Sequence, residues 1–231
     1  MPHNSRYGSY HRVHACPGFG GYRADVTTKI YLETGKKRVF ASSLRWPGWA
    51  RFAAGEEAAI IALDTYAPRY AAFLEPSGIP FRAERFEVVE RHPGSGNTDF
   101  GVPDKPAAAD AVHVPPKERE RLATILRTAW AYFDSTVAGS PAELRKGPRG
   151  GGRDRDKMAA HVLESELAYA RMLGLRQRDT VPVEERRAEV LEAVRDPQGE
   201  WRWPLPYAVR RFTWHLLDHA WEMQDRSTPE G

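Results

Sequence analysis

Four segments beyond Pro116 carry the patterns of α-helices, and this run of helices most constrains the fold. The predicted helices span residues 117–137, 154–173, 183–195 and 207–226. In the first, second and fourth, apolar side chains recur every three or four positions and so share one face of a helix. The third is short and heavily charged; Pro182 precedes it as Pro206 precedes the fourth, where proline is tolerated in a first turn. Four helices in about 110 residues predict a four-helix bundle.

The first half of the chain mixes strand-like and helix-like patterns. Residues 29–33 and 38–44 are β-prone runs around a plausible hairpin turn, and residues 81–90 alternate apolar and polar side chains. Between these strands, residues 56–74 are rich in alanine and repeat apolar side chains at helical spacing. The glycines and prolines of residues 91–116 indicate a linker. We therefore expect an α+β fold.

This pattern divides the chain into three parts. We expect a small sheet-plus-helix module over residues 29–104 and the helical bundle over residues 115–226. Residues 1–28 show a period of neither two nor 3.6 residues. Two histidines there lie close to the chain's single cysteine, but no predicted hairpin or helix would fix the geometry of metal ligands. A flexible tail is the expected structure.

Composition excludes several classes of protein. The 34 Lys and Arg residues exceed the 31 Asp and Glu residues by only three, too few for a nucleic-acid-binding surface over the whole chain. Apolar stretches such as residues 58–63 are far shorter than a membrane span, and residues 1–20 lack the apolar core of a secretory signal. Cys16 alone excludes an intramolecular disulfide. We expect a cytoplasmic protein with a small-molecule substrate and neither nucleic acid nor membrane as partner, while a homodimer stays open.

Three of the eight histidines fall inside the predicted bundle helices. His161 lies on the second helix, and His215 and His219 lie on the fourth, all at the border of an apolar stripe. Because a four-residue step turns a helix by only about 40°, His215 and His219 leave the same side one turn apart. Three neutral imidazoles leave an open position on a divalent ion, as a catalytic site requires. Imidazole ligands suit Zn, our first expectation, and also Ni, Fe or Cu.

Glu222 is the acidic residue best placed to assist these histidines. It follows His215 by seven residues and faces the same way. It could orient an imidazole, replace a water as a ligand or act as a general base. Spacing alone leaves a second interpretation open, because His-x-x-x-His pairs occur by chance and a lone histidine such as His161 often serves only as a hydrogen-bonded border residue.

Two motifs in the predicted bundle resemble a known superfamily. Residues 153–166 (RDRDKMAAHVLESE) and 207–222 (YAVRRFTWHLLDHAWE) are similar to the second-helix and last-helix motifs of the DinB-like superfamily. That superfamily includes YfiT-like hydrolases and mycothiol-dependent maleylpyruvate isomerase, and the likeness covers about residues 115–226. The resemblance implies a four-helix bundle that holds a divalent metal on a histidine triad. The ligands that it implies here are His161, His215 and His219.

The first half of the chain carries a second resemblance. Residues 39–49 (VFASSLRWPGW) and 55–63 (GEEAAIIAL) join a Pro-Gly turn to an alanine-rich helix. They resemble the HicB-like fold, a small sheet packed on one helix, over about residues 30–75. HicB antitoxins commonly append a small DNA-binding domain, whereas this chain continues into helices. The resemblance leaves open a non-catalytic binding or regulatory protein that acts through this module, with structural histidines.

The positive charge of the chain is concentrated in one loop. Residues 145–157 contain six basic and two acidic residues, so their net charge of +4 exceeds the +3 of the whole chain. The loop runs into the helix that bears His161, and a helix amino terminus favours anions. It is equally consistent with a solvated loop whose aspartate caps the helix and with a cradle for an anionic substrate or a low-molecular-weight thiol cofactor. The candidate clamps are Arg149, Arg153 and Arg155.

The leading hypothesis is a metal-dependent enzyme. The ion would activate water or a thiol, or polarise a carbonyl, with Glu222 as the candidate base. The implied activities are those of a metal-dependent hydrolase or of a thiol-dependent transferase or isomerase.

Overall fold

The computed structural model describes residues 27–83, 85–147 and 152–227, which divide into two compact units. The described residues of 27–45, 50–68 and 80–105 form one, here called the sheet unit. Those of 46–49, 69–79 and 106–227 form the other, the helical unit. One unit holds a four-stranded sheet and the other is helical, so the expected α+β class is confirmed at this level.

The tail predicted over residues 1–28 lies outside the described residues, except for Thr27 and Thr28, which begin the first strand. Within the described ranges, no helix combines the length and the apolar character needed to cross a bilayer.

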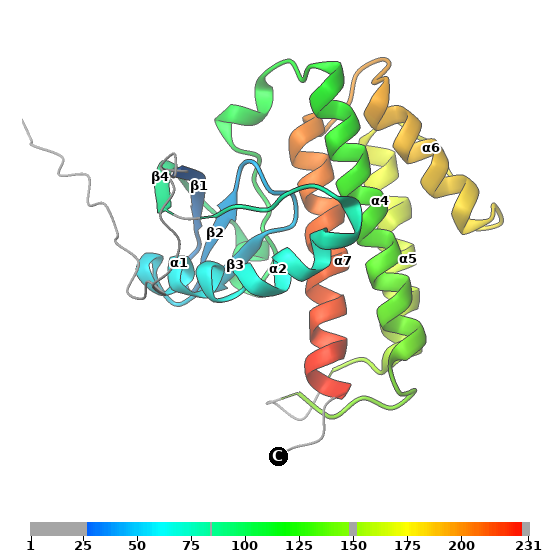
Figure 1. The fold of residues 1–231 in the computed structure, drawn as a ribbon, viewed down its shortest axis with the longest axis horizontal. Coiled ribbons are helices and arrows are strands. Elements are labelled where there is room, and N and C mark those ends of the chain that lie inside the picture. The colour runs from blue at the N-terminus through cyan, green and yellow to red at the C-terminus, as the bar shows by residue number, and fades with distance from the viewer. Residues whose placement is uncertain (1–26, 84, 148–151, 228–231) are drawn as a thin grey trace, which may run out of the picture. The chain divides into compact units, whose positions relative to one another are not determined.

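The sheet unit is built on four strands and a helix. The strands are β1 (Thr27–Thr34), β2 (Val39–Ser43), β3 (Ala50–Ala53) and β4 (Arg85–Pro93). Their order is β3-β2-β1-β4, with β1 antiparallel to β2 and parallel to β4 (Figure 1). Helix α1 (Glu56–Thr65) packs on β2 and β3. Because Leu32 of β1, Phe40 of β2 and Leu63 of α1 are fully buried, the core of this unit lies between sheet and helix.

Part of the predicted linker belongs to the sheet unit. Residues 91–105 include the end of β4 and the short helix α3 (Gly96–Phe100). Glu33 of β1 is fully buried and accepts hydrogen bonds from the Thr98 hydroxyl and from the backbone N–H groups of Asp104 and Lys105. A buried carboxylate needs such donors. The linker interpretation is therefore wrong for this segment, which Glu33 holds in place.

Proline divides the helix predicted over residues 56–74. Helix α1 ends at Thr65, and α2 (Ala67–Leu74) begins after Tyr66. Pro68 has no backbone N–H to donate to the carbonyl of Asp64, and its ring is tolerated only in a first turn. A new helix therefore starts at this point, followed by the 3-10 turn η1 (Glu75–Ser77).

The helical unit contains the four helices that the sequence predicts. They are α4 (Pro116–Gly139), α5 (Arg155–Met172), α6 (Val183–Arg195) and α7 (Leu205–Ser227). Helix α4 packs against the other three, and α5 also packs against α7. Figure 1 shows α4, α5 and α7 running alongside one another, with α6 inclined to them. The 3-10 turn η2 (Ala108–Ala111) precedes α4 and contacts α7.

Helix α7 is buried on nearly all sides along its first half. All residues from Tyr207 to Leu217 are buried, although the segment includes arginines. Gly48, with φ +83°, lies so close to α7 that a Cβ there would come within 2.6 Å of the Thr213 side chain. A buried charged group is costly unless it is paired. Arg210 is paired, because its guanidinium bonds to the buried carboxylate of Asp110.

Candidate metal centre

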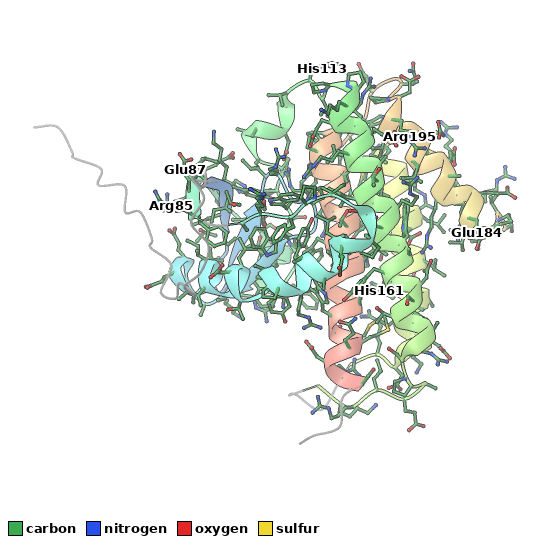
Figure 2. All side chains as sticks on the ribbon, in the orientation of Figure 1. Arg85, Glu87, His113, His161, Glu184 and Arg195 are labelled. Atoms are coloured by element: carbon green, nitrogen blue, oxygen red, sulfur yellow. The ribbon has the colours of Figure 1, made fainter. Side chains whose placement is uncertain are left out.

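Helices α5 and α7 run antiparallel, and this brings the three predicted histidines together. The backbone N–H of Arg145, in the loop before α5, donates to the carbonyl of Arg226 near the end of α7. The amino-terminal half of α5 therefore lies beside the carboxyl-terminal half of α7. His161 is on that half of α5, and Figure 2 shows it beside the carboxyl-terminal half of α7.

The ring nitrogens of His161, His215 and His219 converge. One ligand atom from each lies within 4.8 Å of the others. The Nε2 atoms of His161 and His215 are 3.3 Å apart. Two nitrogen ligands about 2.05 Å from one ion, at the tetrahedral angle, are separated by about 3.3 Å. The spacing of this pair therefore fits a shared ion.

Burial favours the neutral form of two of these imidazoles. His215 is only 7% exposed, and its pKa is held well below the ordinary value first by burial and then by the neighbouring His219 and Arg211. The pKa of His161 is also lowered, by burial and then by the charge of Arg153. A neutral imidazole has a free lone pair and is the form that binds a metal. The electrostatics thus favour ligands over cations.

Glu222 contacts the third histidine, His219. Its Oε2 atom lies 3.3 Å from Nδ1 of His219. With the proton on Nδ1, Nε2 of His219 is left free to bind a metal. The bond to His219 is the main reason why the pKa of Glu222 lies below its ordinary value. Of the three roles predicted for Glu222, this contact fits the one that orients an imidazole.

Arg226, which the sequence analysis did not single out, anchors Glu222. Its Nη1 donates to Oε1 of Glu222 at 2.8 Å and to the backbone carbonyl of Arg153 at 2.8 Å, and its Nε donates to the carbonyl of Arg145 at 2.6 Å. The side chain is 92% buried. Gly152, with φ +116°, allows this packing, because a Cβ there would come within 2.8 Å of the guanidinium. The four-residue step from Glu222 was the available signal.

The basic-loop arginines occupy different environments. Arg149 lies outside the described residues. Arg155 donates to the carbonyl of Ser140 at 3.0 Å and to the carboxylate of Asp156 at 2.7 Å. Arg153 has an exposed side chain whose charge acts on His161. Their role in binding a substrate or thiol stays a prediction.

Tyr169 is a second neighbour that sequence reasoning missed. Its ring centroid lies 5.6 Å from that of His215, and its hydroxyl accepts a hydrogen bond from Nη2 of Arg211 at 3.1 Å. Burial raises the pKa of this hydroxyl, so Tyr169 stays a neutral phenol. The eight-residue step from His161 places both on one face of α5, but only the fold shows that this face meets α7.

An open cleft of about 520 Å³ also occurs in the helical unit, beyond the carboxyl end of α5. It is lined by Arg171, Gly174, Leu175, Arg176, Gln177, Glu200 and Arg202. The three converging histidines are not part of its lining. The cleft and the histidine cluster are therefore separate features.

Comparisons of the chain with protein-family models, with curated proteins and with solved structures find no match. The chemistry of the site is therefore argued from its own residues.

Proposed function

We propose that this chain is a divalent-metal-dependent enzyme in which His161, His215 and His219 hold the ion. The observation that carries the proposal is the convergence of three ring nitrogens from two helices within 4.8 Å. Chance histidines on packed helices have no reason to direct their nitrogens at one point, whereas three such nitrogens are a common ligand set for zinc and its neighbours.

The residues around the cluster support a catalytic rather than a purely structural site. Three protein ligands leave a coordination position open, and there a bound ion would polarise a carbonyl or lower the pKa of a water or thiol. Glu222 accepts a hydrogen bond from Nδ1–H of His219 and so orients that ring. Arg226 in turn fixes Glu222. The burial of His215 keeps bulk water away from one side of the site.

The two sequence resemblances suggest to which families the two units belong. We place the helical unit in the DinB-like superfamily as a four-helix bundle, and the sheet unit with HicB-like modules. The reaction would then be hydrolysis, or a thiol-dependent transfer or isomerisation, on a small substrate. The order of the three histidines along the chain supports the DinB-like assignment of the helical unit. The Pro-Gly turn followed by an alanine-rich helix supports the HicB-like assignment of the sheet unit.

Metal content and Co²⁺ binding test the proposal. Purified protein is analysed for metals, stripped with a chelator and titrated with Co²⁺, whose visible absorption intensifies when imidazoles replace its six waters. About one equivalent per chain is expected. His215→Ala and His219→Ala should abolish binding, because each removes a ligand. The matched control is His113→Ala, since His113 is exposed and lies outside the cluster (Figure 2).

Two results would overturn the proposal. One is a wild-type protein that holds no metal and is equally stable in chelator, which would favour the binding or regulatory alternative. The other is a His215→Ala variant that binds Co²⁺ as the His113→Ala control does, since the ion would then sit elsewhere.

A further inference from the structure

Arg211 lies one helical turn before His215, on the face of α7 that carries His215 and His219. The steps from Arg211 to His215 and from His215 to His219 are four residues each, so the three side chains leave α7 on nearly the same side. Arg211 is only 7% exposed. Its guanidinium lies 5.1 Å from the ring centroid of Tyr169 and 5.0 Å from that of Trp214. The charge is thus enclosed beside the proposed metal centre.

The guanidinium of Arg211 has few hydrogen-bond partners. Nη2 donates to the hydroxyl of Tyr169, a neutral acceptor. Nε and Nη1 are buried and have no acceptor among the residues that the structure describes. No carboxylate within the same ranges forms an ion pair with Arg211 at 4.0 Å or less. A buried cation without a counter-charge is strongly unfavourable, so the position of Arg211 calls for an explanation.

Two other buried arginines of α7 show what a structural arginine looks like here. Arg210, the preceding residue, pairs with the buried carboxylate of Asp110. Arg226 pairs with Glu222 and donates to two backbone carbonyls. Arg211 has the burial of these two residues but no anionic partner among the described residues. A bound anion would supply the counter-charge that the described residues lack.

We propose that Arg211 binds the carboxylate of a short organic acid whose other end reaches the metal centre. This inference rests on the proposed metal-dependent function and names its substrate class. The N–H bonds of a guanidinium lie in one plane and match the two oxygens of a carboxylate. With two aromatic rings against it, Arg211 is better suited to a flat carboxylate than to a tetrahedral phosphate.

The spacing limits the length of the acid. Four residues of helix rise about 6 Å, so Arg211 and the metal-binding imidazole of His215 are about 6 Å apart along α7. A four-carbon diacid spans about this distance from one terminal oxygen to the other. Tyr169 is only partly buried, and a rotation of its side chain would open the guanidinium to the incoming acid. The same rotation would free Nη2 to join the new contact.

Calorimetric titration of the Co²⁺-loaded protein with succinate, and separately with inorganic phosphate, tests the inference. Arg211→Met keeps the length of the side chain but removes the charge and its donors. It should weaken succinate binding about 10- to 100-fold, the usual effect of losing charged hydrogen bonds. Arg211→Lys, which keeps a point charge without the planar donors, should fall in between. The matched control is Arg171→Met, in the open cleft that is the rival anion site.

Metal binding and thermal unfolding complete the test. Arg211→Met should bind Co²⁺ as the wild type does and unfold at an equal or higher temperature, because it removes an unpaired buried charge. Arg211→Met that unfolds or loses Co²⁺ would show a structural role and overturn the inference. The inference would also be overturned if wild type and Arg211→Met bound succinate equally well. It would be overturned as well if Arg171→Met lost succinate binding, or if the wild type bound phosphate more tightly than succinate. A wild type that fails to bind Co²⁺ would instead refute the proposed function.

Discussion

Helix α5 contributes to two buried polar groups in the helical unit, and the two are built differently. Glu166 accepts hydrogen bonds from Trp130 of α4 and, through both oxygens, from Arg187 of α6. Arg187 also bonds to Asp134 at 2.6 Å. His161 instead faces His215 and His219, and each neutral imidazole has one nitrogen whose lone pair can bind a metal. The first group is closed by the protein itself, whereas the proposed ion would complete the second.

The comparison suggests a way to separate structural from functional polar groups. A closed network satisfies every donor and acceptor within the fold, so its removal should reduce stability. An open polar group, such as the histidine cluster, brings side chains together that do not satisfy one another's hydrogen-bonding groups. Its removal should therefore reduce ligand binding and leave the fold intact.

The largest expected effect is on the closed network. Glu166→Ala leaves Arg187 and the Trp130 indole without their buried acceptor, and should lower the free energy of unfolding by about 3–5 kcal/mol in urea denaturation. Glu166→Gln should lose less, because an amide oxygen still accepts from Trp130. The exposed neighbour Glu164 offers the control, since Glu164→Ala should change stability by less than about 0.5 kcal/mol. Glu166→Ala with near wild-type stability would contradict the structural role.

A smaller effect is expected at the border of the open group. Glu222→Gln weakens the acceptor that fixes His219, and removing such a partner typically lowers metal affinity about 10- to 100-fold. Competition of Co²⁺-loaded protein with a chelator measures the change. Unfolding free energy of the metal-free protein should shift by less than about 1 kcal/mol, because Glu222 is 37% exposed. An unchanged affinity would argue that Glu222 does not orient His219.

The smallest effect is a pH dependence of the metal-free protein. Burial lowers the folded-state pKa of His215 below the unfolded value of about 6.5, so the unfolded chain takes up its proton first as the pH falls. Stability from this group is complete above pH 6.5 and decreases on acidification, by up to about 1.4 kcal/mol per pH unit. Urea denaturation between pH 7.5 and 5 should show this loss, reduced in His215→Ala. Equal slopes in the two proteins would assign the loss to other groups.

Local patterns predicted the helices of the helical unit well. The bounds of α6 match the expected residues 183–195, and α4 and α5 differ by at most two residues at either end. Helix α7 begins at Leu205, two residues early, because Pro206 fits within a first turn. Where apolar periodicity and proline position agree, the sequence alone is sufficient.

The sheet unit was harder to predict. No local pattern predicted β3, a short strand that follows the Pro-Gly turn, and the strand predicted over residues 81–90 spans Arg85–Pro93 instead. Strand pairing depends on partners distant in the chain, so local alternation gives the strand without its limits.

The candidate site shows the same division. Helical spacing indicated that His215 and His219 share a face, and the apolar stripe of the second helix placed His161 at the border of the bundle interior, which the resemblance then supported. The contacts of Tyr169 and Arg226, and the lack of a counter-charge at Arg211, depend on how α5 meets α7. No spacing rule within one helix contains that information.

Helix α7 carries His215, His219, Glu222, Arg226 and Arg211 on one continuous rod. If the helix slid along its axis or turned, these groups would move as a set, and their mutual geometry would survive. His161 alone among the three histidines stands on another element. The distance from His161 to His215 and His219 therefore depends on the register between α5 and α7. A substitution far from the site that shifts this register by one residue, about 1.5 Å, would weaken metal binding by moving His161 relative to His215 and His219.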